Sequence, residues 1–485
     1  FKQKTAYEML RSLVGSEMCI RDSVYIPELD RTFNRHPDFR IFAAQNPLGQ
    51  GGGRKGLPKS FLDRFSLVHM EELDSTDLNA IAAALHPDLD ADVLRKMIAF
   101  NSTVHRQTMD TRAFGVEGSP WEFNLRDVLR WLTLVRSSTG LDARRHEAVE
   151  YFGLLYLQRF RNGRDRDHVS RLFADAFGEA VDPLARPWPF VSAQHVQVGH
   201  SLLPRDDSSI AVERASAALP IRRESLQPLE ALVKCLDMGW LAILTGPRAT
   251  GKTALVRQVA ALAGKRLREF TMNAEVDTLE LLGSFEQADR LRDLDSVAKD
   301  AIVLLKDAAT AQLKTDATSD VYSALAALRQ VRLQLATEAA DLDVVALGQT
   351  IRQVLQGLAP VSPPAIDLTA RLDLAVTNAD TSAAAARFEW IDGPLVQAMK
   401  NGDWLLVEDA NLCSPSVLDR LNSLFETGGR LQLAERGPVN GEIQVIAPHP
   451  DFRLVMTLDP RNGELSRAMR NRGIEIAVLA FSPPD

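Results

Sequence analysis

The sequence predicts an α/β fold, in which parallel sheets flanked by helices are accompanied by an all-helical lid and a helical insertion. Three observations predict it. The apolar run Trp240–Leu244 leads directly into a glycine-containing loop and a helical pattern. A strand-then-helix unit occurs twice, beginning at His36 and at His449. Between residues 288 and 386, apolar residues three and four apart indicate amphipathic helices.

The composition excludes several classes of protein. The 485 residues are 45% hydrophobic and 25% charged, which is typical of globular chains and excludes wholesale disorder. No apolar run approaches the roughly 18 residues that span a bilayer. Three cysteines (Cys19, Cys235 and Cys413) predict no disulfide framework and favour a reducing compartment. The net charge of −8 argues against a generally cationic nucleic-acid binder.

The first part of the chain reads as an incomplete α/β core. Residues 1–23 have neither a signal peptide's apolar core nor a transit peptide's pattern, and they are typical of a translated sequencing adapter, so we expect a non-native segment. Residues 24–75 then predict the C-terminal part of a first core. Its elements are a buried strand at Phe39–Ala44, a helix at Leu57–Phe65 and a strand at Leu67–Met70.

The rest of the chain predicts a lid and a second core. Strand signals fade after residue 75, so residues 76–183 predict an all-helical lid. Residues 184–225 are rich in Pro and Ser and predict a connector. The second core is expected at 226–287 and 387–485, interrupted by the helical insertion at 288–386, whose tail from Ala359 onward predicts a loop.

A phosphate-binding loop carries the clearest chemistry. The pattern GxxxxGK[ST] is matched by Gly246, Pro247, Arg248, Ala249, Thr250, Gly251, Lys252 and Thr253. Glycines let backbone N–H groups surround phosphate oxygens at the start of a helix. Lys252 would neutralise the β- and γ-phosphates of ATP, and the Thr253 hydroxyl would bind Mg²⁺. The alternative is an ordinary strand-to-helix turn.

Two carboxylates follow a second buried strand, Trp404–Val407. Glu408 would hold Mg²⁺ through water, and Asp409 would orient the attacking water. In P-loop ATPases the usual order of these two residues is Asp then Glu. Here the second residue is Asp, whose side chain is one methylene shorter, and this predicts slow hydrolysis of ATP. The alternative is a pair of solvated acids at a strand end.

The internal repeat adds further candidates. HPDFRIFAAQNP (36–47) and HPDFRLVMTLDP (449–460) place Asn46 and Asp459 after a strand, where a polar side chain would sense the γ-phosphate. An amide donates a hydrogen bond to phosphate, whereas an ionised carboxylate repels it. Arg64 and Arg472 follow at positions suited to an arginine finger, or to structural pairing with acids.

Basic residues of the lid leave two interpretations open. Arg126, near the start of a predicted helix, is a candidate to reach a nucleotide, or it is a helix-surface charge. The stretch QRFRNGRDRDH (158–168) could contact RNA, but its interleaved acids favour a solvated face.

Several segments together resemble the midasin family of dynein-like AAA+ ATPases. The resemblance covers about Val24 to Ile476 apart from the insertion. The segments that carry it are QNPLGQGGGRKGLPKSFLDRF, PWEFNLRDVLRW, EFTMNAEVDTLELLGSFEQ, FEWIDGPLVQAMKNGDWLLVEDANLCSPSVLDRLN and DPRNGELSRAMRNRGIEI. It implies P-loop AAA+ modules, and the wording is most similar to the end of the third and most of the fourth module of that family.

The resemblance implies a ring of six AAA modules in one chain. Such a ring uses ATP to release assembly factors from pre-60S ribosomal particles in the nucleolus and nucleoplasm, so the implied partners are neighbouring modules, the particle and its factors. Because the next module supplies the finger in such rings, Arg64 would serve the site of the second module and Arg472 that of the third. The Lys252 site would need an arginine from a further module, so this chain alone is expected to be catalytically incomplete. Alternatives are a nucleotide-holding structural module, or another dynein-like or MoxR-type AAA+ chaperone.

Overall fold

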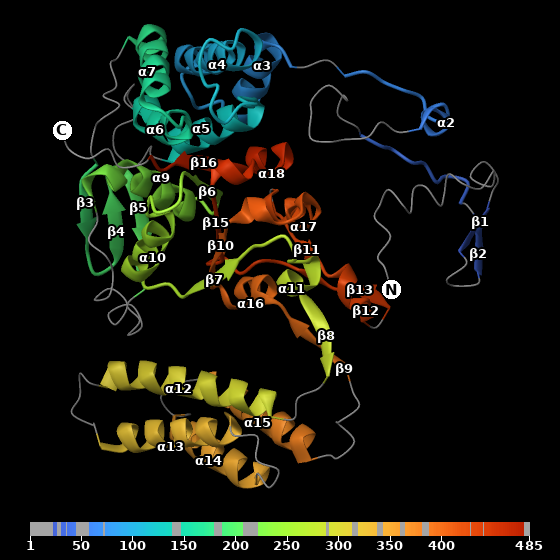
Figure 1. Cartoon of the computed structure of the whole chain (residues 1–485), viewed down its shortest axis with the longest axis vertical. Coiled ribbons are helices and arrows are strands. Elements are labelled where there is room, and N and C mark those ends of the chain that lie inside the picture. Colours follow the sequence, from blue (N-terminus) through green and yellow to red (C-terminus); the bar gives the residue numbers. More distant parts are fainter. Residues whose placement is uncertain are drawn as a thin grey trace. The chain divides into compact units, whose positions relative to one another are not determined.

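The computed structural model describes most of the chain, and it divides into two compact units, Phe1–Asp74 and Ser75–Asp485 (Figure 1). The described residues are 23–26, 31–34, 36–44, 58–70, 73–137, 147–178, 187–206, 222–287, 291–312, 319–336, 343–358, 364–380, 388–426, 428–439 and 441–479. Within these ranges, no helix is both long and apolar enough to cross a membrane. The expected adapter-derived segment lies outside them except for Ser23.

The described part of the first unit contains an antiparallel hairpin that the sequence did not predict. Strand β1 (Ser23–Ile26) pairs antiparallel with β2 (Arg31–Asn34), and the predicted helix is the short α2 (Lys59–Leu62). The prediction of buried strands at 39–44 and 67–70 is wrong, because both segments are exposed and neither forms a strand that is hydrogen-bonded to a neighbour. A buried strand needs a neighbour for its backbone groups, and among this unit's described residues β1 and β2 pair only with each other.

Among the described residues from Ser75 to Phe177, helices are the regular secondary structure, as the fading strand signals predict (Figure 1). They are α3 (Ser75–Leu85), α4 (Ala91–His105), a π-helix (Arg106–Asp110), α5 (Leu125–Ser137), α6 (Glu147–Leu155), a 3-10 helix (Leu157–Arg159) and α7 (Gly163–Phe177). Asp90 begins α4 by accepting a hydrogen bond from the Asp92 N–H. The core of this lid is aromatic, with Phe100, Trp131 and Phe173 fully buried.

A small antiparallel sheet occupies part of the predicted connector. Its strands are β3 (Pro189–Val191), β4 (His195–Val198) and β5 (Ser201–Pro204). The prediction of a connector alone is wrong here, because the alternation in β4 buries Val196 and Val198 while Gln197 is exposed. This short period-2 pattern is easily masked by the surrounding Pro and Ser.

The central sheet is five-stranded and parallel, in the order β16-β6-β15-β10-β7. Its strands are β6 (Leu241–Thr245), β7 (Leu267–Thr271), β10 (Trp404–Glu408), β15 (Arg453–Leu458) and β16 (Gly473–Ala477). In β6, Ala242 and Leu244 face a core shared with α9 (Leu226–Asp237) and α10 (Lys252–Ala263). Leu241 and Ile243 face a second core on the other side.

That second core is covered by α11 (Thr278–Leu282) and α16 (Pro394–Asn401). The remaining elements are β8 (Gly283–Gln287) paired with β9 (Phe388–Asp392), β11 (Leu431–Gln432) with β14 (Val445–Ile446), β12 (Pro438–Val439) with β13 (Glu442–Ile443), α17 (Pro415–Asp419), α18 (Arg467–Arg472), and 3-10 helices at Arg223–Ser225, Ala410–Leu412, Asn422–Phe425, Ala434–Arg436 and Pro460–Asn462. Because all strands of the central sheet are parallel, the residues after β6, β10 and β15 meet at one edge.

The insertion is a helical bundle with its own hydrophobic core. Its helices are α12 (Arg292–Gln312), α13 (Ser319–Ala336), α14 (Val344–Leu358) and α15 (Pro364–Asp380). The prediction of a loop after Ala359 is wrong, because Ala365, Leu368, Leu372 and Ala375 are buried at helical spacing in α15.

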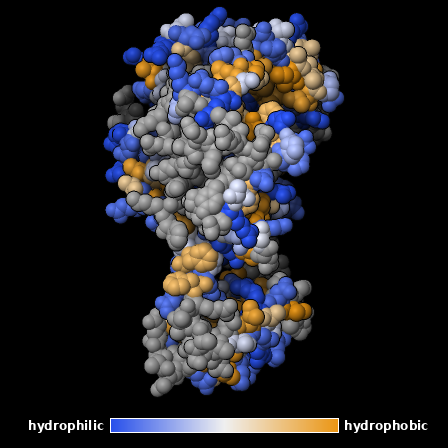
Figure 2. Space-filling view, turned by 90° about the vertical axis from the view of Figure 1, so that its right-hand side faces the viewer, coloured by the Kyte–Doolittle hydropathy of each residue, from blue (hydrophilic) through white to orange (hydrophobic). Residues whose placement is uncertain are grey.

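On the face shown in Figure 2, hydrophilic and apolar residues are interspersed.

Candidate functional site

The phosphate loop lies between β6 and α10, at the carboxyl edge of the central sheet. Gly246 N–H donates to the Leu458 carbonyl at 3.3 Å, which ties the loop to the neighbouring strand β15. A Cβ at Gly246 would stand 2.3 Å from the Val478 carbonyl oxygen, so only glycine fits this close approach. Gly251 has φ +91, a conformation that glycine adopts readily, and α10 begins directly after it.

Lys252 lies at the centre of this loop. Its Nζ donates to the carbonyls of Gly246 and Pro247, each at 2.7 Å, and the residue is 9% exposed. Burial lowers the pKa of Lys252, although the carboxylates of Asp459 and Asp409 act in the opposite direction. A buried ammonium among backbone N–H groups at a helix start is suited to an anionic ligand.

The predicted metal ligands lie in contact. The Thr253 hydroxyl donates to Glu408 Oε1, and the Thr271 hydroxyl is 3.4 Å from Glu408 Oε2. Thr253 and Glu408 are 155 positions apart in the sequence, and the parallel arrangement of β6 and β10 in the sheet brings them together. Among the described residues no group of three or more His, Cys, Asp or Glu could hold a metal. A hydroxyl beside a carboxylate nevertheless fits Mg²⁺, which keeps several waters and nucleotide oxygens as ligands.

Asp409 adopts a left-handed backbone conformation, with φ +51 and ψ +43. Its N–H lies 3.3 Å from the Thr457 hydroxyl of β15. Asp tolerates this conformation better than most residues. The negative charge of Asp409 raises the pKa of Lys252 against the lowering effect of burial, and the role of Asp409 in orienting water stays a prediction.

Asp459 is paired with a residue that the sequence analysis does not single out. Arg461 Nη2 donates to Asp459 Oδ2 at 2.6 Å, and Arg461 Nε lies 3.1 Å from both carboxylate oxygens. Hydrogen bonding from the Arg461 guanidinium lowers the pKa of Asp459 to about 2, against the opposing effect of burial. Asp459 is therefore ionised at neutral pH. The i, i+2 spacing of Asp and Arg in DPR is the signal that could have identified the pair.

Arg472 and Arg126 come together at the opposite edge of the sheet. Arg472 ends α18, directly before β16, whose first residue pairs with the first residue of β6. The length of β6, roughly 15 Å at 3.3 Å per residue, therefore separates Arg472 from the phosphate loop. Arg126 Nη1 donates to the Asn471 carbonyl at 3.3 Å. Arg130, which the sequence analysis misses, donates to the Arg472 carbonyl.

The Arg472 side chain is held within its own module. Its guanidinium donates to Glu426 Oε1 at 2.8 Å and to the Asn422 carbonyl at 3.1 Å. Arg64 lies in an exposed turn of the first unit, and Asn46 lies outside the described residues.

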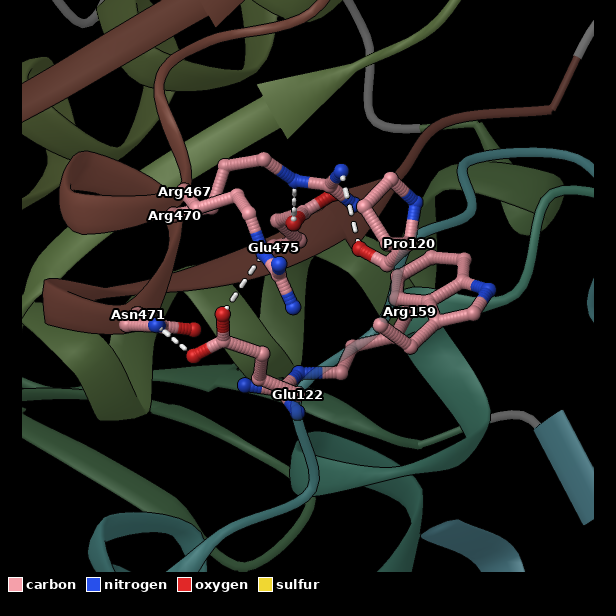
Figure 3. A pocket seen from close by; sticks show the side chains of 8 residues that line it. Pro120, Glu122, Arg159, Arg467, Arg470, Asn471 and Glu475 are labelled. Carbon is pink, nitrogen blue, oxygen red and sulfur yellow. Dashed lines mark hydrogen bonds and ion pairs between the residues drawn. The ribbon is translucent and has the colours of Figure 1, made fainter. Parts of the chain in front are cut away.

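A charged cluster joins the lid to the sheet (Figure 3). Arg159 forms two hydrogen bonds with Asp127, at 2.8 and 3.1 Å, and both side chains are buried. Glu475 of β16 accepts from Arg470 at 2.6 Å and from Arg161 at 3.5 Å. Arg470 also donates to the Gly118 carbonyl of the lid at 2.7 Å.

This cluster corrects the interpretation of residues 158–168 as a solvated face. Arg159 and Arg166 are buried, and the Arg161 side chain is 10% exposed and contacts Glu464. Arg166 donates to the Ala477 carbonyl of β16 at 3.0 Å. These guanidiniums are used in packing the lid against the sheet, which periodicity within the segment could not reveal.

Comparisons with known proteins agree with this architecture. A family model described as the midasin AAA lid domain matches residues 77–180, and a model of the AAA domain of the dynein-related subfamily matches residues 365–472. The midasin of Dictyostelium discoideum is 35% identical over 96% of this chain, and the midasin of Giardia intestinalis is 31% identical over 98%. The chain spans 9% and 11% of the lengths of these relatives. The parallel sheet with its phosphate loop, the helical lid and these similarities together show that the chain belongs to the midasin family of dynein-related AAA proteins.

Proposed function

We propose that this chain is the ATP-binding and ATP-hydrolysing part of a midasin ring motor that remodels pre-60S ribosomal particles and releases assembly factors. The observation that carries the proposal is the contact between the Thr253 hydroxyl and the Glu408 carboxylate beside the phosphate loop. Residues of these types hold Mg²⁺ in P-loop ATPases. The family supports the ring and the ribosomal substrate.

The chain's own residues have distinct roles in this proposal. Backbone N–H groups at the start of α10 bind phosphate oxygens, and Lys252 neutralises their charge. Thr253 and Glu408 hold Mg²⁺, which supplies further neutralisation of the phosphates when bound. Asp409 orients the attacking water.

Calorimetry with Mg-ATP on the whole chain tests the nucleotide site. We expect micromolar-range binding by the wild type and its loss in Lys252→Ala, because the variant lacks the buried ammonium. Circular dichroism of both proteins checks that the variant is folded. A folded wild type that does not bind nucleotide would contradict the proposal.

Hydrolysis at this site needs a second module. Arg472 lies at the opposite edge of the sheet from Lys252, so the finger for the Lys252 site must come from elsewhere in a ring. Arg472 and Arg126 would together serve the nucleotide of the preceding module. Robust turnover by this chain alone, abolished by Lys252→Ala, would contradict this division of roles.

A nucleotide-holding module is the second candidate function. The acidic Asp459 and the short, left-handed Asp409 favour it over hydrolysis. The two functions are distinguished in a full-length midasin by Asp409→Asn. A hydrolysing site predicts lower ATPase activity in this variant, whereas a holding site predicts unchanged activity. The resemblance to midasin makes a MoxR-type chaperone the weaker alternative.

We also propose that the protein works in the nucleolus and nucleoplasm, beside neighbouring AAA modules and pre-60S assembly factors. The family supports these partners. Fluorescence microscopy of the tagged full-length protein, with co-purification of pre-60S particles, is the test, and exclusion from the nucleus would contradict it.

A further inference from the structure

Asp459 places a negative charge beside the phosphate loop, at a position where the sequence predicts a γ-phosphate sensor. It directly follows β15, whose last residue, Leu458, pairs with Thr245 and accepts a hydrogen bond from Gly246 of the phosphate loop. Its charge acts on Lys252. An exposed carboxylate at this position would repel the triphosphate of ATP.

Arg461 covers this carboxylate. The Asp459 side chain is 2% exposed, whereas the Arg461 side chain is 66% exposed. A ligand that approaches this pair from solvent would therefore meet the guanidinium and not the carboxylate. The guanidinium is close enough to the loop for its charge to act on Lys252.

Arg461 also keeps hydrogen-bond donors available. Arginine carries five N–H donors, and Arg461 uses Nε and one N–H of Nη2 on Asp459. Within the described part of the chain, Nη1 of Arg461 has no hydrogen-bond partner. A guanidinium fixed on one side by a carboxylate is suited to bind an anion on the other.

The internal repeat shows the same substitution as a pair. The first copy reads Asn46-Pro47-Leu48, with an amide and no following arginine, and the second reads Asp459-Pro460-Arg461. The acidic residue thus occurs together with the arginine, and the amide occurs without it. On the level of sequence, each copy therefore carries one side chain with N–H donors in this stretch, the amide of Asn46 or the guanidinium of Arg461.

We propose that Arg461 binds the γ-phosphate of ATP, with Asp459 as the positioning residue that orients its guanidinium. This inference rests on the proposed nucleotide site at Lys252. The carboxylate–guanidinium pair takes the role that the sequence predicts for the amide in the first copy of the repeat. The site therefore distinguishes ATP from ADP through Arg461.

The test compares the affinities of the whole chain for Mg-ADP and for a non-hydrolysable Mg-ATP analogue by calorimetry. Arg461→Leu is expected to weaken the ATP analogue about 10- to 100-fold, the size of one charge-assisted hydrogen bond, with ADP affinity nearly unchanged. The double variant Asp459→Asn/Arg461→Leu recreates the Asn-Pro-Leu of the first copy. It is expected to recover most of the lost affinity, because the amide donates to phosphate and the carboxylate is gone.

Arg266→Leu is the matched control. Arg266 is also a partly exposed arginine, with a side chain 54% exposed and 4.0 Å from a buried aspartate, Asp403, but it precedes β7 at the opposite edge of the sheet. It should leave both affinities unchanged. The inference is overturned if Arg461→Leu leaves the affinity for the ATP analogue unchanged or weakens ADP binding equally, because either result would limit Arg461 to a structural role. If the wild type binds neither nucleotide, the proposed function fails and the inference falls with it.

Discussion

Glu408 ends β10, and Asp459 follows the neighbouring strand β15. The hydrogen-bond partners of these two carboxylates give them different properties. Glu408 accepts hydrogen bonds from the hydroxyls of Thr253 and Thr271, which are neutral, so its charge remains available to a cation. The negative charge of Asp459 is balanced by the guanidinium of Arg461, which holds the pKa of Asp459 at about 2. At the scale of residues, the partner therefore decides which acid can serve Mg²⁺.

Glu408 should control the magnesium dependence of nucleotide binding. Removing Mg²⁺ with a chelator should weaken ATP binding by the wild type. In Glu408→Gln, the ratio of the ATP affinities with and without Mg²⁺ should be smaller by on the order of tenfold, because the neutral amide attracts the cation less. Calorimetry with and without Mg²⁺ measures it. Glu269→Gln on the adjacent strand β7 is the control, since Glu269 is paired with Arg257. Equal magnesium dependence in wild type and Glu408→Gln would contradict the assignment.

At the scale of elements, buried charge joins the lid to the sheet. The lid precedes the sheet in the chain, yet its Arg161 contacts Glu475 of β16, and its Asp127 and Arg159 form a buried pair beside the same strand. Burial raises the pKa of Glu475, but Arg470, Arg161 and Arg159 outweigh this effect and hold the pKa below its ordinary value. Both partners must remain charged for this junction to be stable.

Glu475→Gln should destabilise the chain by about 3–5 kcal/mol, because it leaves buried guanidiniums without a counter-charge. The free energy of unfolding in urea measures this. Glu426→Gln is the matched control. Glu426 also pairs with an arginine, Arg472, but its side chain is 57% exposed, so the loss should stay below about 1 kcal/mol.

The same junction should depend on pH. Because the folded-state pKa of Glu475 is below its ordinary value of 4.5, its contribution is fully present above that pH and is lost as the pH falls further. The stability difference between wild type and Glu475→Gln should therefore shrink below about pH 4.5. A difference that is constant down to pH 3 would contradict this, and urea unfolding across that range decides it.

The insertion is an element with a separate core, so its stability should be separable from nucleotide binding. Ile351 of α14 is 0% exposed within that core. Ile351→Ala should destabilise the bundle by about 2–5 kcal/mol while ATP affinity changes little. Hydrogen exchange of α12–α15 together with calorimetry measures both. A parallel loss of ATP affinity would show that the bundle and the nucleotide site are coupled.

At the scale of the whole molecule, the proposed function assigns the two edges of the central sheet to different nucleotide sites. Lys252 lies at the carboxyl edge, and Arg472 and Arg126 lie at the amino edge. Arg472→Ala should therefore leave the Mg-ATP affinity of this chain within about twofold of wild type, since no hydrogen bond links it to the loop. Calorimetry of Arg472→Ala and Lys252→Ala with Mg-ATP tests this. A loss of affinity in Arg472→Ala as large as that in Lys252→Ala would show that Arg472 acts on the nucleotide of this chain's own phosphate loop, against the proposal.

The elements whose signal is local could be predicted from the sequence alone. The phosphate loop, its flanking strand and helix, and the buried strand before Glu408 were predictable, because a GxxxxGK[ST] loop and continuous apolar runs are specified by adjacent residues. So were the lid helices, whose apolar periodicity is strong. The strands expected at 39–44 and 67–70 failed because a strand depends on a neighbour that is distant in sequence.

Only the tertiary structure decided the partners of the charged side chains. Residues 158–168 read as a solvated basic stretch, yet Arg159, Arg161 and Arg166 are packed between the lid and β16. Arg461 carried no motif, and its importance comes from the carboxylate it covers and the loop beside it. The sequence by itself determined the family, the phosphate loop and the helical lid, since these follow from local patterns of residues. The fold decided which charges are buried, paired or available to a nucleotide, because electrostatic interactions depend on distances that sequence spacing does not set.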